Sequence, residues 1–176
     1  MRAVDRKESL FVLFVFVAVI LMFSLLSSRS PYVVTEAPDQ QTILGDNDMV
    51  VPSFSGDIIV GKSTRDEVMK IFPEGKNLGR SGLYRPNNLD CLVTFSRNEN
   101  VVVRMDIGPS DLATSRGIRA NDSFDKVVEK YGSNYTKTYY KEKPQIFDAY
   151  YGSDQYILFK IENNIVKKIL VGSPIS

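Results

Sequence analysis

The sequence predicts an α+β fold of two tandem repeats, each a strand, a short helix and an antiparallel meander, with the helices on one face of antiparallel sheet and one transmembrane helix in front. Three observations lead to it. Residues 60–72 resemble residues 119–131, which indicates that one half-domain occurs twice. Residues 94–108 resemble residues 158–172 in the same order. A long apolar run near the N-terminus stands apart from both copies.

The first repeat begins with a short strand, predicted at residues 57–60 from its apolar run. Thr64 and Glu67 then match the capping-box pattern, in which hydroxyl and carboxylate oxygens satisfy backbone N–H groups at a helix start. The predicted helix has an apolar stripe made of Val68, Ile71 and Phe72. Pro73 ends the helix, because proline lacks the N–H that a continuing helix needs.

The second repeat carries the same signals. Asp122 or Ser123 is predicted to cap its helix, and Gly132 to end it in a left-handed conformation. The apolar face of this helix is made of Phe124, Val127, Val128 and Tyr131. Neither helix is long enough to be stable in water by itself, so both are expected to depend on packing against the sheet.

Strand-like runs follow each helix. They are residues 92–96 and 101–107 in the first half, and residues 156–161 and 165–171 in the second. Residues 98–100 and 162–164 are rich in asparagine and are predicted as the hairpin turns between these strands. Each half alone would bury too little surface to be stable, so we expect the halves to share one core.

The apolar run at residues 10–28 predicts a retained transmembrane helix of just sufficient length. Basic residues are more frequent before the run than after it, which places the N-terminus inside and the remainder outside the cell membrane, as a single-pass protein. The alternative is a cleaved signal peptide that yields a secreted protein. Its apolar core is usually shorter, and cleavage after Ser30 would leave Pro31 directly behind the cut.

These observations divide the chain into five parts. They are a cytoplasmic N-terminus (1–9), a transmembrane signal-anchor (10–28), an extended linker rich in proline, asparagine and aspartate (29–55), and the two repeats (56–111 and 112–176).

Charge and composition exclude several classes of function. The chain has 22 Lys and Arg against 21 Asp and Glu, so it offers no strong basic field for nucleic acid. It has no histidine, which removes the ordinary Ser-His-Asp triad and most zinc sites. Its single cysteine, Cys91, opens a predicted strand and is expected to be a buried apolar residue. We therefore assign no catalytic residue, no metal and no cofactor.

One motif suggests chemistry. Residues 56–63 satisfy the P-loop expression G-x-x-x-x-G-K-[ST], whose lysine and serine would bind nucleotide phosphate. Apolar residues fill the middle of this loop, however, where a phosphate-binding loop needs a flexible turn. We expect no nucleotide at this segment, and a nucleotide-binding or hydrolytic enzyme that uses Gly61, Lys62 and Ser63 stays as the alternative function.

Aromatic residues give the strongest binding signal. Seven of the nine tyrosines lie within residues 131–156, in the stretch that is longer in the second half. Tyrosine is enriched at recognition surfaces, but it is also a common strand residue, so adjacent pairs place one ring inside and one outside. The candidate partner-binding residues are Tyr139, Tyr140, Tyr150 and Tyr151. Exposed tyrosines in this stretch would favour a protein or a glycan ligand.

The repeated pattern of a small residue, a Ser/Thr cap, an acidic residue, valine and an aromatic, then a hairpin ending at Gly108 or Gly172, resembles the SmpA/OmlA and β-lactamase-inhibitory-protein-like superfamily. The resemblance covers residues 57–172, and the tandem form is more similar to the inhibitor. It implies an envelope or secreted binding protein rather than an enzyme. The lipoprotein branch has a lipid-modified N-terminal cysteine that this chain lacks, so a role in outer-membrane assembly does not carry over.

No inhibitor contact residue can be placed on this sequence either. The sequence thus predicts a non-enzymatic protein-binding module of the cell envelope, anchored through residues 10–28 and outside the cytoplasm, with an envelope or extracellular protein as its partner. If the N-terminal segment is cleaved, the alternative is a secreted inhibitor.

Overall fold

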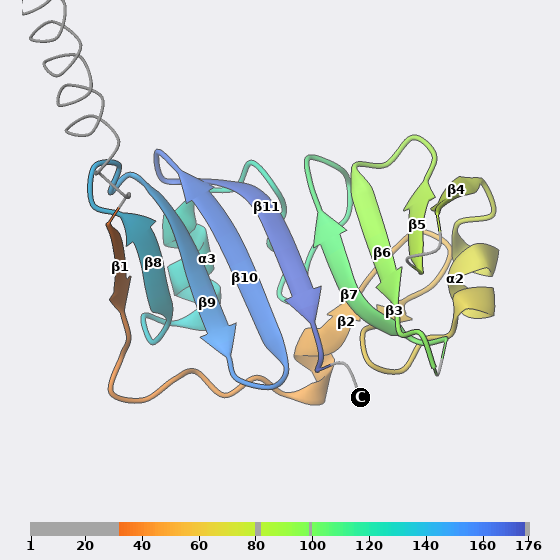
Figure 1. The fold of residues 1–176 in the computed structure, drawn as a ribbon, viewed down its shortest axis with the longest axis horizontal. Helices are drawn as coiled ribbons and strands as arrows, with labels where there is room; N and C mark the ends of the chain where they lie inside the picture. The colour runs from red at the N-terminus through yellow and green to blue at the C-terminus, as the bar shows by residue number, and fades with distance from the viewer. Residues whose placement is uncertain (1–31, 80–81, 99, 175–176) are drawn as a thin grey trace, which may run out of the picture. The chain divides into compact units, whose positions relative to one another are not determined.

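The computed structural model describes residues 32–79, 82–98 and 100–174. The chain divides into two units, of which the second, Val33–Ser176, contains all the strands and helices named below. Its centre is a nine-stranded antiparallel sheet (Figure 1). In spatial order the strands are β1 (Val33–Glu36), β8 (Thr136–Tyr140), β9 (Ile146–Gly152), β10 (Tyr156–Glu162), β11 (Ile165–Gly172), β7 (Val102–Ile107), β6 (Cys91–Phe95), β5 (Leu83–Pro86) and β4 (Gly75–Leu78).

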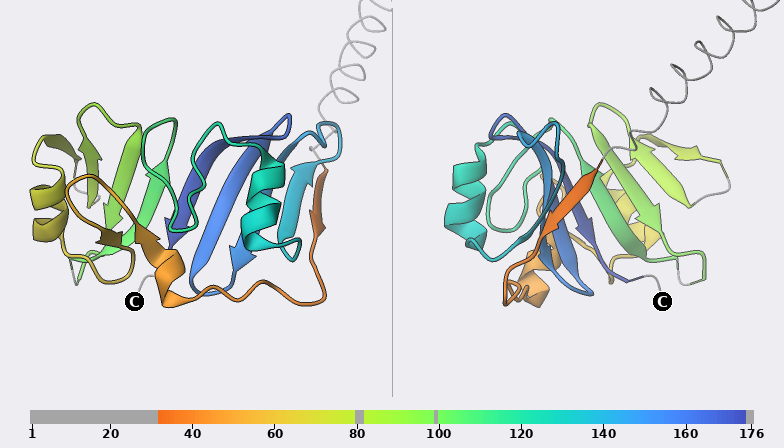
Figure 2. Two further views of the ribbon diagram at one scale, coloured as in Figure 1. Left: turned by 180° about the vertical axis from the view of Figure 1, so that it is seen from behind. Right: turned by 60° about the vertical axis from the view of Figure 1, so that its left-hand side comes forward.

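Two α-helices accompany the sheet among the described residues, α2 (Arg65–Ile71) and α3 (Phe124–Tyr131). A 3₁₀ helix, η1 (Asp46–Met49), leads into a small two-stranded sheet of β2 (Val50–Val51) and β3 (Ile58–Ile59). The left view of Figure 2, which is turned by 180° from Figure 1, shows α3 in front of the strands of the second half. In Figure 1 the same helix lies behind these strands.

The α+β prediction is wrong. The described part of the chain is mainly one large antiparallel sheet, and the two α-helices found there have only 7 and 8 residues. The prediction missed β1, β2, β4, β5, β8 and β9; the Gly75–Leu78 strand, for example, has no regular alternation of apolar and polar residues. The two hairpin pairs that were predicted are present as β6–β7 and β10–β11, and β7 pairs with β11 so that both halves form one sheet.

Equivalent backbone contacts attach each helix start to the hairpin of its own half. Arg65 N donates to Asn100 O at 3.0 Å, and Phe124 N donates to Asn164 O at 2.8 Å. Isolated bridges join Thr64 to Val101 and Ser123 to Ile165 in the same way. Asn100, Asn163 and Asn164 at these turns have positive φ angles, which asparagine adopts more readily than most residues.

The helix ends follow the sequence signals. Thr64 and Glu67 form the predicted capping box, in which Thr64 N donates to the Glu67 carboxylate at 2.7 Å. The hydrogen bond from the Thr64 backbone lowers the pKa of Glu67. Ser123 caps α3, and Gly132 ends it with φ 85°. Both caps are local interactions, which is why the sequence predicts them.

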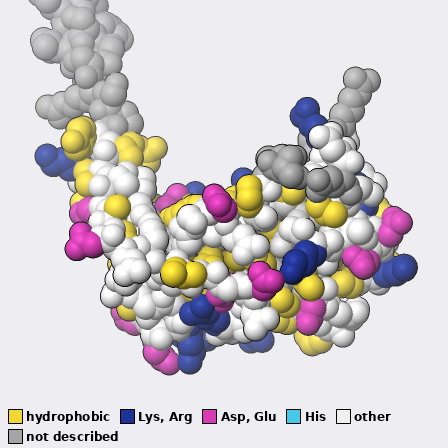
Figure 3. Space-filling view, turned by 90° about the horizontal axis from the view of Figure 1, so that it is seen from below, with side chains coloured by type: hydrophobic (Ala, Val, Ile, Leu, Met, Phe, Trp, Pro, Cys, Tyr) yellow, Lys and Arg dark blue, Asp and Glu magenta, His cyan; other side chains and the backbone are white. Residues whose placement is uncertain are grey.

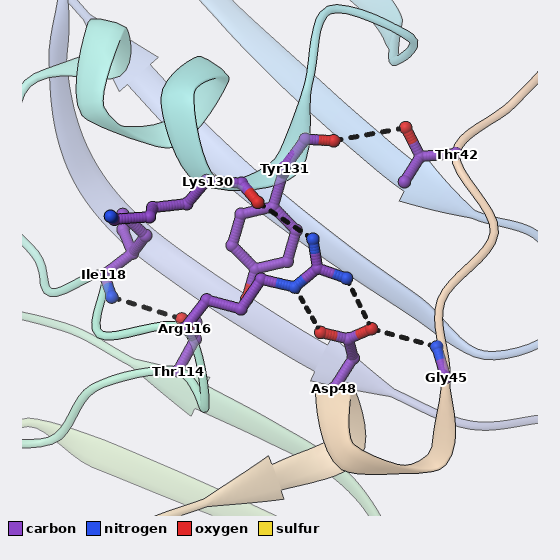
Figure 4. Close-up of polar contacts among 8 residues, drawn as sticks. All are labelled: Thr42, Gly45, Asp48, Thr114, Arg116, Ile118, Lys130 and Tyr131. Carbon is purple, nitrogen blue, oxygen red and sulfur yellow. Dashed lines mark hydrogen bonds and ion pairs between the residues drawn. The ribbon is translucent and has the colours of Figure 1, made fainter.

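Residues 33–55, predicted as part of an extended linker, are built into the folded unit. Strand β1 pairs with β8, and Met49 and Val51 are fully buried in the core. The segment is attached to the second half by Asp48, whose carboxylate accepts from Arg116 Nε at 2.6 Å and Nη2 at 2.8 Å (Figure 4). Arg116 also donates to Lys130 O at the end of α3, and its guanidinium lies 4.5 Å from the centre of the Tyr131 ring.

Within the described residues, no helix combines the length and apolar composition needed to cross a bilayer. The described residues therefore give no support to the prediction of a single-pass membrane protein. The segment on which that prediction depended, residues 10–28, lies outside the described residues, as does the N-terminal part at 1–9.

Candidate interaction surface

The sheet has one face turned to the helices and one open face. Core side chains occupy alternate positions on the strands, so the positions between them point to the open face. One row there crosses five strands through paired residues, in the order Leu92, Asp106, Leu170, Leu158 and Tyr150. Leu170 is 8% exposed and the other four are half-buried. An apolar stripe with one carboxylate thus runs across the open face.

An arginine–aspartate pair lies at the middle of this face. Arg104 Nε donates to Asp106 Oδ1 at 2.5 Å and Arg104 Nη2 to Oδ2 at 2.7 Å, a two-pronged contact that holds the guanidinium in one plane. The Arg104 side chain is 43% exposed and that of Asp106 only 12%. The bond to Asp106 is the main cause that raises the pKa of Arg104, and Tyr156 contributes to the same rise. The arginine is therefore positioned and still accessible.

Two tyrosines extend this pair across the second half. Tyr150 and Tyr156 are stacked, with ring centres 5.3 Å apart and planes inclined by 19°. The Tyr156 ring lies directly over Gly172, where an added Cβ would collide with the ring. Gly172 in turn pairs with Arg104 in the sheet. Glycine at 172 thus leaves room for the ring between Tyr150 and Arg104.

We call this group the Tyr–Arg platform. Its members are Leu92, Arg104, Asp106, Tyr150, Tyr156, Leu158 and Leu170. Tyr150 is fixed further because its hydroxyl donates to Ser153 O at 2.7 Å, and burial raises the pKa of that hydroxyl. A rigid aromatic pair beside an oriented arginine, bordered by leucines, is the composition typical of protein interfaces.

The four predicted tyrosines do not form one surface. Tyr151 is fully buried, and its hydroxyl donates to Gly132 O at 2.9 Å, so it has a structural role. Tyr139 points to the helix side of the sheet edge and donates to Glu36 Oε1 at 2.7 Å. Tyr140, 49% exposed, and Tyr150 point to the open face, and only Tyr150 belongs to the platform.

Sequence reasoning missed Arg104, Asp106 and Tyr156. A signal for the first two was present, since polar residues two apart within an apolar strand such as Val102–Ile107 share its solvent face. The partner of this pair was not predictable, because Tyr156 reaches Arg104 only when β7 pairs with β11.

The P-loop-like segment is arranged differently from a phosphate cradle. Ile58 and Val60 are buried, and the N–H groups that would have to face a phosphate already donate to carbonyl oxygens. Gly61 N donates to Val102 O at 2.6 Å, and Lys62 N and Ser63 N both donate to Ile59 O. The Lys62 ammonium is exposed and lies 3.2 Å from Asp46.

Other chemistry is sparse in the part of the chain that the structure describes. No group of three or more His, Cys, Asp or Glu residues there is arranged to hold a metal ion. Cys91 is buried, and burial together with Asp106 and Asp90 raises the pKa of its thiol to about 12. Figure 3 shows acidic and basic side chains interspersed on the side seen from below, with no large block of one sign.

No protein-family model matches the chain, and no curated protein matches it. A solved structure with some likeness is the 1.5 Å crystal structure of an extracellular protein containing an SCP domain from Bacillus anthracis str. Ames. The TM-score is 0.47 and the sequence identity 8%, over 63% of this chain and 43% of that one. This chain therefore spans less than half the length of that protein, and a likeness so distant identifies neither a family nor an activity.

Proposed function

We propose that the folded unit is a non-enzymatic protein-binding module and that the Tyr–Arg platform is its contact surface. The observation that carries this proposal is the Tyr150–Tyr156–Arg104 arrangement on the open face. Tyrosine and arginine dominate interface hot spots because they bury much surface and lose little side-chain freedom when they are already held in place.

The chemistry of the platform favours a protein over a sugar. Arg104 has its charge partly balanced by Asp106, so it can donate hydrogen bonds without burying an unpaired charge. Leu92 and Leu158 lie in the row of paired residues that passes through Asp106, and they offer apolar surface that a polar sugar would not cover well. The resemblance to a superfamily of binding proteins, based on residues 57–172, is part of the same proposal.

Partner capture with matched variants tests this function. The full chain is crosslinked in its own cells as wild type, as a Leu92→Ser/Leu158→Ser platform variant, and as an Ile43→Ser/Phe54→Ser control. The control removes two apolar side chains that are 83% and 94% exposed but lie off the platform. We expect one partner to be recovered by wild type and control and lost by the platform variant, while all three remain folded and show a cooperative thermal transition.

Recovery of the same proteins by all three would contradict the platform as the contact surface. Lys62→Ala distinguishes the binding module from the alternative of a nucleotide-binding enzyme. For a binding module, the substitution should leave partner recovery unchanged. An enzyme that uses this lysine would lose nucleotide binding.

A further inference from the structure

Strand β1 lies at one edge of the nine-stranded sheet and pairs there with β8. None of its residues belongs to the core, and three of the four, Val33, Thr35 and Glu36, are exposed. Figure 1 shows it as the outermost strand beside β8. A four-residue edge strand without a buried side chain contributes little to stability and opens at low free-energy cost.

The chain that follows β1 is held independently. Thr42 N donates to Asn134 O at 3.0 Å, and the Thr42 hydroxyl donates to the same oxygen at 2.9 Å. Gln41 is hydrogen-bonded to Thr136, and Asp48 is ion-paired to Arg116. Release of β1 would therefore leave the segment from Gln41 onward in place and would expose only the edge of β8.

The edge of β8 has a defined chemistry. Tyr139 Oη donates to the Glu36 carboxylate at 2.7 Å, and Glu36 lies opposite Lys137. The Lys137 ammonium lies 4.8 Å from the centres of the Tyr139 and Phe147 rings, so a positive charge is held on the side of β8 that carries Tyr139. Val34 lies opposite Tyr139 on the same side of the strand. The edge thus accommodates an aliphatic residue and, two positions later, an acidic one.

We propose that β8 is an acceptor edge for an extended segment of a partner protein with an aliphatic and then an acidic residue at this spacing, and that β1 occupies the edge until such a segment displaces it. Strand addition of this kind gains affinity from main-chain hydrogen bonds and specificity from alternate side chains. The site lies at the sheet edge and does not depend on the Tyr–Arg platform.

The test uses the full chain and a fluorescent peptide with the sequence of residues 32–38. Thr35→Cys/Thr138→Cys joins two residues that face each other in the β1–β8 register, so oxidation locks β1 in place. Val34→Pro weakens β1 instead. We expect Val34→Pro to bind the peptide at least about tenfold more tightly than the oxidised double-cysteine variant, because the open edge is then more populated. Reduction of the disulfide should restore binding.

Two controls examine the recognition. A peptide with lysine in place of the acidic residue, and a protein with Tyr139→Phe added to Val34→Pro, should each bind more weakly. Absence of binding to Val34→Pro up to about 1 mM peptide, near the effective concentration of a tethered strand, would overturn the proposal. Equal binding by the locked and reduced forms would overturn it too. A Val34→Pro dimer that excludes the peptide would show instead that a second copy occupies the edge.

Discussion

Asp106 and Leu170 face each other in the central strand pair, and they hold the same position in the two halves of the chain. In the alignment of residues 94–108 with residues 158–172, Asp106 and Leu170 occupy the same position. In the structure, the pairing of β7 with β11 places them opposite one another. The axis that relates the halves therefore passes between these two residues. The Tyr–Arg platform lies across this axis. Leu92 and Leu158 are equivalent, because each pairs with one of these two residues, whereas Arg104 corresponds to Lys168, so the platform differs between the halves.

The halves also share a tyrosine that bonds to the end of the helix. Tyr84 Oη donates to Phe72 O at 2.6 Å and Tyr151 Oη to Gly132 O at 2.9 Å, and each carbonyl belongs to a helix C-cap residue. Tyr84→Phe and Tyr151→Phe should each lower the free energy of unfolding by about 1–3 kcal/mol, because a partly buried carbonyl is left unpaired. Urea unfolding of both single variants and the double variant measures this.

The two losses should add, because the sites lie in different halves and have no shared partner. Tyr139→Phe is the control, since its hydroxyl bonds to an exposed carboxylate, and its unfolding curve should match wild type. A large loss in Tyr139→Phe, with none in the other two, would refute the structural role of the paired hydrogen bonds.

How much the sequence can predict depends on the range of the interactions involved. The cap at Thr64 and the end of α3 at Gly132 were predictable, because side-chain and backbone preferences within a few residues determine them. Strand β4 was not, since Gly75–Leu78 has no apolar alternation and forms only by pairing with β5. The burial of Met49, in a segment with linker-like composition, likewise depends on contacts distant in sequence.

The Asp48–Arg116 pair should be the most costly polar interaction to remove. The Asp48 side chain is 7% exposed, and Arg116 also packs on Tyr131 and donates to Lys130 O. Asp48→Ala removes two charge-assisted hydrogen bonds to Arg116, so we expect a loss of about 2–3 kcal/mol in the free energy of unfolding. Calorimetry and denaturant unfolding measure it.

Asp46→Ala is the matched control, because the Lys62–Asp46 pair is 63% and 78% exposed and such surface pairs contribute little. Similar losses in the two variants would mean that Asp48 does not hold residues 33–55 against the second half.

Acid should weaken the capping box at α2. The hydrogen bond from the Thr64 backbone lowers the pKa of Glu67 in the folded state, so the carboxylate contributes stability above its unfolded pKa, and this contribution is lost as the pH falls through the lower, folded value. Glu67→Gln should therefore be less stable than wild type near neutrality, and the difference should shrink below about pH 4. Urea midpoints of both proteins across this range give the measurement, and a difference that stays constant with pH would contradict it.

A substitution at Gly172 would disturb the Tyr–Arg platform directly. A methyl group at this position would collide with the Tyr156 ring, so Gly172→Ala must push the ring away from Arg104 and from Tyr150. We expect a loss of about 1–3 kcal/mol in the free energy of unfolding from overpacking, together with weakened partner binding. Gly45→Ala is the control, since Gly45 has φ −96° and no atom within 4 Å of an added Cβ. If Gly172→Ala lowers stability but leaves partner binding at the level of Gly45→Ala, Tyr156 is not part of the contact surface.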